Sequence, residues 1–217
     1  MRNALLLVGL AITLMLISCE ERRSPSKESG ELTVSDSTSV AKRQAALEEE
    51  LLNDPTWVDP GLRTGITPAG LDFTPQKDRK MDNYLEISVG DNTDVVVKLV
   101  SSRTDNCIRY VYVKGNDTYR INNIPQGLYY LKIAYGRNWR QKEIEGKIVG
   151  KFLTNAQYEI GTETLDYNIS YGSKEYTDEG YVQNYSIPSY SVSLNVVQFA
   201  ALNSFDTNSI SESEFNE

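Results

Sequence analysis

The stretch that decides the fold is residues 119–135, YRINNIPQGLYYLKIAY. Apolar and polar residues alternate on both sides of a central break, IPQG at 124–127, and this period of two predicts β-strands. Pro125 has the fixed φ that suits the second position of a type I turn, and Gly127 suits the fourth position, where the chain leaves the turn. We therefore predict a strand, a tight turn and a second strand, paired as a β-hairpin.

The second strand of this hairpin has two different faces. One face carries Tyr129, Leu131, Ile133 and Tyr135, and the other carries Leu128, Tyr130, Lys132 and Ala134. A strand with an apolar face needs another layer to cover that face, and an isolated hairpin is only marginally stable in water. The hairpin is therefore expected to belong to a larger sheet.

Other alternating segments follow one another at intervals marked by turn residues. They are 85–89, 94–100, 108–113, 147–153, 157–161, 165–171 and 190–199. The sequence Gly90-Asp91-Asn92 predicts a second hairpin between the first two of these segments. Short strands with almost no helical pattern between them are typical of an antiparallel sandwich rather than of βαβ units. We therefore predict an all-β domain over residues 82–201, folded as an antiparallel β-sandwich.

The central stretch also resembles a known family. The signature is an aromatic-x-hydrophobic strand followed by Ile/Val-Pro-x-Gly-x-Tyr-x-hydrophobic, and it is carried by Tyr119, Ile121, Ile124, Pro125, Gly127, Tyr129, Leu131 and Ile133. It resembles carboxypeptidase-regulatory-like and transthyretin-like domains over about residues 82–145. The resemblance implies a sandwich of transthyretin-like or immunoglobulin-like form. It transfers no catalytic residue, because such domains are mostly structural or adhesive appendages.

The N-terminal residues combine a basic residue, an apolar run and a cysteine. Arg2 precedes an apolar run of 14 residues, 4–17, which is shorter than the about 20 residues that span a bilayer. The ending Leu-Ile-Ser-Cys resembles a lipobox, which implies a signal peptide over 1–18 and acylation of Cys19 with fatty acids such as palmitate. The alternative is an ordinary cleaved signal followed by an incidental cysteine.

Residues 19–81 are expected to connect this anchor to the sandwich. The Ser-, Lys-, Glu- and Thr-rich stretch after the cysteine cannot bury enough apolar surface to fold, so it predicts a disordered tether. Residues 40–53, VAKRQAALEEELLN, are good helix formers with leucines near one stripe, and they predict a short helix. Pro and Gly breaks then predict an extended connector over 54–80, held to the domain by Trp57 and Phe73.

The composition excludes several kinds of function. The chain has 22 Lys and Arg against 30 Asp and Glu, and a net charge of −8 repels phosphate backbones, so we expect no nucleic-acid partner. The absence of histidine excludes Ser-His-Asp and Cys-His catalysis and His-ligated zinc. With Cys19 acylated, Cys107 has no disulfide partner in the chain, and we predict it to be a small buried residue without a nucleophilic role.

Carboxylates offer the remaining chemistry. Asp91 with Asp94, and Asp178 with Glu179, lie in predicted turns where oxygen ligands for calcium could converge, but neither pair has the spacing of a recognised loop. Glycosidase chemistry needs two carboxyls about 5 to 10 Å apart in a cleft. The acidic residues lie mainly in linkers, turns and the disordered tail that we predict over 202–217. We therefore expect no enzyme activity, no metal and no cofactor.

The chain has fourteen tyrosines, six of them between residues 167 and 190. Tyrosine is a favoured strand residue, and strand propensity explains most of these positions without a ligand. Tyr176, Tyr181 and Tyr185 are the exception, because GSK at 172–174 and DEG at 178–180 predict a loop around them. An aromatic side chain on a loop is a better candidate for binding than one on a strand. These three are the predicted ligand-binding residues.

The sequence therefore predicts a lipid-anchored cell-envelope protein that acts as a non-catalytic binding or assembly module. Its expected location is the outer membrane. The acidic pair Glu20-Glu21 after the lipobox resembles the signal that sends some Gram-negative lipoproteins to the cell surface. The expected partners are the membrane, through the lipid anchor, and other envelope proteins or a glycan. The alternative hypothesis is a glycan-binding lipoprotein of a nutrient-uptake system, with the aromatic residues of 176–185 as its site.

Overall fold

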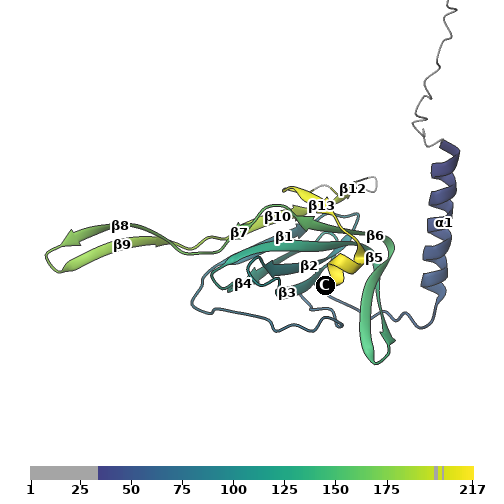
Figure 1. Ribbon diagram of the computed structural model, residues 1–217, viewed down its shortest axis with the longest axis horizontal. Helices are drawn as coiled ribbons and strands as arrows, with labels where there is room; N and C mark the ends of the chain where they lie inside the picture. Colours follow the sequence, from purple (N-terminus) through teal and green to yellow (C-terminus); the bar gives the residue numbers. More distant parts are fainter. Residues whose placement is uncertain (1–33, 198–199, 202) are drawn as a thin grey trace, which may run out of the picture. The chain divides into compact units, whose positions relative to one another are not determined.

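The computed structural model describes residues 34–197, 200–201 and 203–217 (Figure 1). Two compact units divide the chain, the first ending at Val40 and the second running over Ala41–Glu217. Cys19, the predicted signal peptide and most of the predicted tether lie outside the described residues. None of the described helices is both long enough and apolar enough to cross a membrane.

The predicted helix forms, and it is longer than expected. Helix α1 covers Val34–Asn53, so its end agrees with the prediction and its start lies before residue 40. Residues 34–39 were expected to belong to a structureless tether, and this expectation is wrong. Ser, Asp and Thr are moderate helix formers, but adding residues to an existing helix avoids the unfavourable nucleation step.

The second unit is built on two β-sheets, and the predicted all-β sandwich is confirmed. The larger sheet has the strand order β13-β6-β5-β2-β3, and the smaller has the order β10-β1-β4. The strands of the larger sheet are β2 (Asp94–Ser101), β3 (Cys107–Val113), β5 (Leu128–Ile144), β6 (Lys147–Gly161) and β13 (Thr207–Ser209), with β7 (Leu165–Asp166) also paired to β5. Those of the smaller sheet are β1 (Tyr84–Val89), β4 (Thr118–Asn122) and β10 (Tyr190–Leu194).

Two further strand pairs and one short helix complete the described chain. They are the pair β8 (Ser170–Thr177) with β9 (Gly180–Ser186), the pair β11 (Val196–Val197) with β12 (Ala200–Ala201), and helix α2 (Glu212–Asn216). Neighbouring strands in the sandwich are antiparallel, as expected, with the exception of β1 and β10, which pair in parallel.

The core lies between the two sheets and takes side chains from both. From β5 it takes the predicted apolar face, Tyr129, Leu131, Ile133 and Tyr135, all of them buried. Leu85 and Ile87 of β1 cover this face from the smaller sheet, and both are fully buried. The period-two pattern therefore identified the inward side of the central strand correctly.

Both predicted hairpins are instead crossings between the sheets. β4 pairs with β1, whereas β5 pairs with β2, β6 and β7, so the turn at Pro125 joins two layers. The turn at Gly90 does the same, because β1 and β2 also belong to different sheets. The physical reason is that alternation is satisfied in both arrangements. Two amphipathic strands can lie side by side in one sheet, or face each other across a core.

The crossing between β4 and β5 is held by a buried amide. Asn83 is 2% exposed, and its Oδ1 accepts a hydrogen bond from the backbone N–H of Ile124 at 2.8 Å. Its Nδ2 donates to the carbonyl of Ile124 at 2.9 Å, so one side chain satisfies both main-chain groups of that residue. The hydroxyl of Tyr129 donates to the carbonyl of Pro125 at 3.1 Å and fixes the outgoing end.

The outer face of the larger sheet has a second, smaller core. It contains Val96, Tyr110, Tyr112, Ala134, Trp139, Phe152 and Phe215. Phe73 of the connector packs against this cluster, with its ring 6.2 Å from that of Tyr110 in an edge-on arrangement, as expected. The other predicted anchor, Trp57, has the ammonium groups of Lys142 and Lys151 at 5.8 and 5.4 Å from its ring centroid.

The C-terminal segment is ordered, so the prediction of a disordered tail is wrong for residues 203–217. Strand β13 pairs with the edge of β6, and helix α2 follows it. Ser211 and Glu214 form a capping box at the start of α2, and this box places Phe215, which is 1% exposed, in the outer core. The sequence S-E-S-E-F at 211–215 carries this signal, but a five-residue helix is too short to show any periodicity.

Two lysines complete the other end of α2. The ammonium of Lys132 donates to the carbonyl of Glu214 at 2.5 Å, and that of Lys98 donates to the carbonyl of Phe215. Cations at a helix C-terminus satisfy unpaired carbonyls and oppose the negative end of the helix dipole. Lys98 is 2% exposed, and because burial disfavours its charged form, the pKa of its ammonium is lowered to about 8.

We predict that Asn83→Ala lowers the free energy of unfolding by about 2–4 kcal/mol, because it leaves two buried main-chain groups of Ile124 without partners. Asn122→Ala on the neighbouring strand is the matched control, since Asn122 is exposed. Urea denaturation, followed by tryptophan fluorescence, measures both variants. Equal midpoints for the two variants would show that the crossing does not depend on this amide.

Candidate functional site

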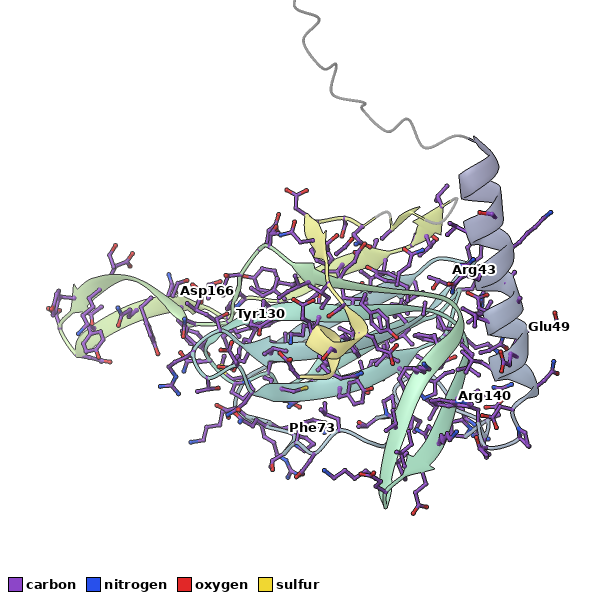
Figure 2. The ribbon with its side chains drawn as sticks, turned by 45° about the vertical axis from the view of Figure 1, so that its right-hand side comes forward. Arg43, Glu49, Phe73, Tyr130, Arg140 and Asp166 are labelled. Atoms are coloured by element: carbon purple, nitrogen blue, oxygen red, sulfur yellow. The ribbon has the colours of Figure 1, made fainter. Side chains whose placement is uncertain are left out.

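The candidate site is a hairpin outside the sandwich, formed by β8 and β9. The two strands make a sheet of their own, and in the described chain neither pairs with any other strand. Every residue of β8 is exposed, and so is every residue of β9 except one. Figure 1 shows the hairpin extending away from the two sheets, and in Figure 2 Asp166 labels the part of the chain that leads into it.

The structure corrects the local setting of the three predicted binding residues. Tyr176, Tyr181 and Tyr185 lie on the strands of this hairpin and not in a loop, with a two-residue turn at Asp178 and Glu179 between the strands. Their exposed fractions are 81, 55 and 64%. The predicted loop setting is therefore wrong, and the predicted role of these exposed side chains in ligand binding stays a prediction.

A β-bulge in β8 determines which way its tyrosines point. Tyr176 pairs with Tyr181, and further along the hairpin Tyr171 pairs with Tyr185. Between these pairs β8 has one residue more than β9, and this produces a shift in register just after Tyr171. In a regular strand two residues five positions apart face opposite sides. The extra residue reverses this relation, so Tyr171 shares the face of Tyr176.

One face of the hairpin consequently gathers its large side chains. We call it the tyrosine face, and it consists of Tyr171, Lys174, Tyr176, Tyr181, Gln183 and Tyr185. The rings of Tyr171 and Tyr185 are 6.4 Å apart at 48°, and those of Tyr176 and Tyr181 are 6.3 Å apart at 55°. The ammonium of Lys174 lies 4.3 Å from the ring centroid of Tyr181. At about 3.4 Å per residue, the two tyrosine pairs are about 14 Å apart.

Sequence reasoning missed Tyr171 as a member of this face. It was assigned to the predicted strand 165–171, and the GSK segment after it was interpreted as part of a loop. A glycine inside an alternating segment is also a signal for a bulge, and Gly172 is such a glycine. Pairing Tyr171 with Tyr185 across a bulge would have found the fourth ring.

The other side chains that could react or bind a ligand make hydrogen bonds within the protein. The thiol of Cys107 donates to the carbonyl of Arg109 at 3.0 Å, and burial raises its pKa to about 11, so it is protonated near neutral pH. Asp94 accepts hydrogen bonds from the Tyr112 hydroxyl and the Gly115 N–H, each at 2.8 Å. Among residues 34–197, 200–201 and 203–217, no three His, Cys, Asp or Glu side chains come together as metal ligands.

Comparison with known proteins identifies no relative, because no family model, no curated protein and no solved structure matches the chain. The resemblance of residues 119–133 to carboxypeptidase-regulatory-like domains therefore stays a prediction.

We predict that replacing Tyr171, Tyr176, Tyr181 and Tyr185 together by Ser leaves the sandwich folded. Exposed substitutions usually change stability by less than about 0.5 kcal/mol each, and a cross-strand aromatic pair contributes at most about 1 kcal/mol. Tyr167→Ser is the contrasting variant, because Tyr167 is fully buried. Removing its ring should lower the free energy of unfolding by about 3–5 kcal/mol, as for other truncations of large aromatic side chains. Thermal melts compare the two. If the fourfold variant had a melting temperature as low as that of Tyr167→Ser, the four rings would be needed for folding.

Proposed function

We propose that this protein is a lipid-anchored, non-catalytic binding module of the cell envelope, and that its tyrosine face docks another envelope protein. The observation that carries the proposal is the set of four tyrosines, all between 55 and 81% exposed, on one face of a hairpin that leaves the sandwich. Tyrosine supplies a large amphipathic contact area with few rotatable bonds, and it is enriched where protein interfaces concentrate their binding energy.

The backbone of the hairpin supports the same proposal. In the described chain β8 and β9 pair only with each other, so the outer edge of each strand is free to accept an extended segment of a partner. The hairpin lacks a core of its own, since a two-stranded sheet buries little apolar surface. Docking a partner on the tyrosine face supplies the missing layer.

Attachment to the membrane rests on the lipobox sequence at residues 16–19. Acylation of Cys19 would hold the protein at the outer membrane, on the periplasmic side or, with the acidic pair at 20–21, on the cell surface. Two or more acyl chains make release negligible, since each buried CH₂ contributes about 0.8 kcal/mol. In this arrangement the anchor retains the module, and the hairpin selects its partner.

A glycan is the second candidate ligand. The observation in its favour is that Lys174 and Gln183 lie between the two tyrosine pairs and can donate hydrogen bonds to hydroxyl groups. However, the rings within each pair are tilted by 48° and 55°, and two tilted rings do not form the flat platform on which a sugar ring stacks. The geometry therefore favours a protein partner.

Cross-linking in intact cells tests the docking proposal. We expect the wild type to give cross-linked species with an envelope protein, and the fourfold Tyr→Ser variant to lose them. A variant with Glu175→Ser and Val182→Ser, a cross-strand pair on the opposite face, is the control and should keep them. A glycan array is run in parallel. Tyrosine-dependent glycan binding without protein cross-links would favour the second candidate, and unchanged cross-links in the fourfold variant would contradict both.

The anchor has its own test. We predict that Cys19→Ser abolishes incorporation of radioactive palmitate, because the acylated thiol is lost, and leaves either an uncut precursor or a periplasmic form without lipid. Cys107→Ser is the matched control and should still be labelled. Labelling that persists in Cys19→Ser would place the anchor at another residue.

A further inference from the structure

A cavity separate from the tyrosine face opens between β3 and β4, which are edge strands of the larger and the smaller sheet. The connector crosses the edge of β3 beside this opening, where the N–H of Tyr112 donates to the carbonyl of Ile66 at 2.9 Å and the N–H of Gln76 donates to the carbonyl of Ile108 at 3.3 Å. The hollow lies between these two contacts and has a volume of about 320 Å³. Figure 2 shows Phe73 on this part of the connector.

The cavity is lined by Arg109, whose charge is not matched by a carboxylate. The residue is 7% exposed, and no Asp or Glu in the part of the chain that the structure describes forms an ion pair with it. Its Nη1 donates to the carbonyl of Ile108 at 2.8 Å, and its Nη2 donates to the carbonyl of Asn123 at 3.3 Å. A guanidinium has five N–H donors, so several have no protein acceptor in this region.

The rest of the lining makes the cavity more positive. Lys77 and Arg120 also line it, and no acidic residue does, although the whole chain carries a net charge of −8. The charge of Arg120 is balanced by Glu86 at 2.5 Å, whereas Lys77 has no ion pair among the described residues. Burying a charge without a partner is strongly unfavourable, and carbonyl oxygens only solvate a cation without neutralising it. An anion in the cavity would remove this imbalance.

The shape and remaining lining narrow the class of anion. A volume of about 320 Å³ corresponds to roughly ten water molecules at about 30 Å³ each, which suits a molecule of about ten to fifteen heavy atoms. Thr67, Asn122 and Asn123 offer hydrogen-bonding groups, and Tyr119 offers an aromatic wall. The planar fork of a guanidinium matches the paired oxygens of a carboxylate and also those of a phosphate, so both kinds of anion are included in the test below.

We propose that this cavity binds a small hydroxylated carboxylate of sugar-acid size, with the carboxylate on Arg109 and the hydroxyl groups on the amide and hydroxyl side chains around it. This site is separate from the tyrosine face. Its ligand is recognised by charge and hydrogen bonding, and the docking proposal neither requires it nor depends on it.

Calorimetric titration with glucuronate tests the proposal, with glucose as the neutral counterpart and phosphate as a tetrahedral anion, all at one ionic strength. We expect the wild type to bind glucuronate and not glucose, and Arg109→Gln to bind it at least tenfold more weakly. Arg103→Gln is the matched control, because Arg103 is exposed on the loop after β2 and the change in charge is the same. It should bind as the wild type does.

A second measurement covers the case in which Arg109→Gln fails to fold. In the ¹⁵N-labelled wild-type protein, the Nε–H resonance of Arg109, assigned by its loss in Arg109→Lys, should shift when glucuronate is added and stay in place with glucose. Equal shifts with both sugars, no shift with either, or a response to phosphate alone would overturn the assignment of a carboxylate site. The absence of a shift with either sugar would leave Arg109 as a residue that holds β3 to the segment before Pro125 by its carbonyl contacts, and a response to phosphate alone would make the cavity a phosphate site.

Discussion

The two hydrogen bonds between the Asn83 amide and the main chain of Ile124 are the constraint on which the rest of the structure depends. Asn83 precedes β1 in the smaller sheet, and Ile124 begins the crossing to β5 in the larger sheet. The amide therefore joins the two layers at one end of the core. Because Tyr129 follows the crossing with its ring in that core, the position of Ile124 also fixes which face of β5 is covered.

This contact between Asn83 and Ile124 explains why the strands could be predicted from the sequence and their pairing could not. Alternation identified the inward face of β5 because burial acts on every second residue, whichever sheet lies opposite. It could not distinguish a hairpin from a crossing, since both bury the same residues of β4 and β5. The deciding contact comes from Asn83, about forty residues earlier in the chain, and a single polar residue carries no periodic signal. The burial of Phe215 could not be predicted for the same reason, because a single aromatic residue after a capping box forms no periodic pattern.

The candidate site shows a related limit. Tyr176, Tyr181 and Tyr185 could be selected from the sequence because turn residues lie near them, and their exposure agrees with that choice. That Tyr171 joins them depends on a register shift of one residue, which is a property of two strands together and not of either alone. Four exposed rings gathered on one face of a two-stranded hairpin bury little apolar surface, and for this reason we propose that the face serves in binding.

Lys98 and Arg109 are buried cations of the larger sheet, and their charges are stabilised in different ways on its two faces. Lys98 points to the outer face, where the Phe215 ring lies 4.6 Å from its ammonium and the end of α2 supplies a carbonyl, so helix and ring close over the charge. Burial then lowers the pKa of its ammonium to about 8, so Lys98 can remove its buried charge by losing a proton. A guanidinium does not lose its proton in this way, because its pKa remains far above neutral even when burial lowers it, as it does for Arg109. Around Arg109 no helix of the described residues covers the charge and the opening is polar, and for this reason we propose that an anion from outside the chain compensates it.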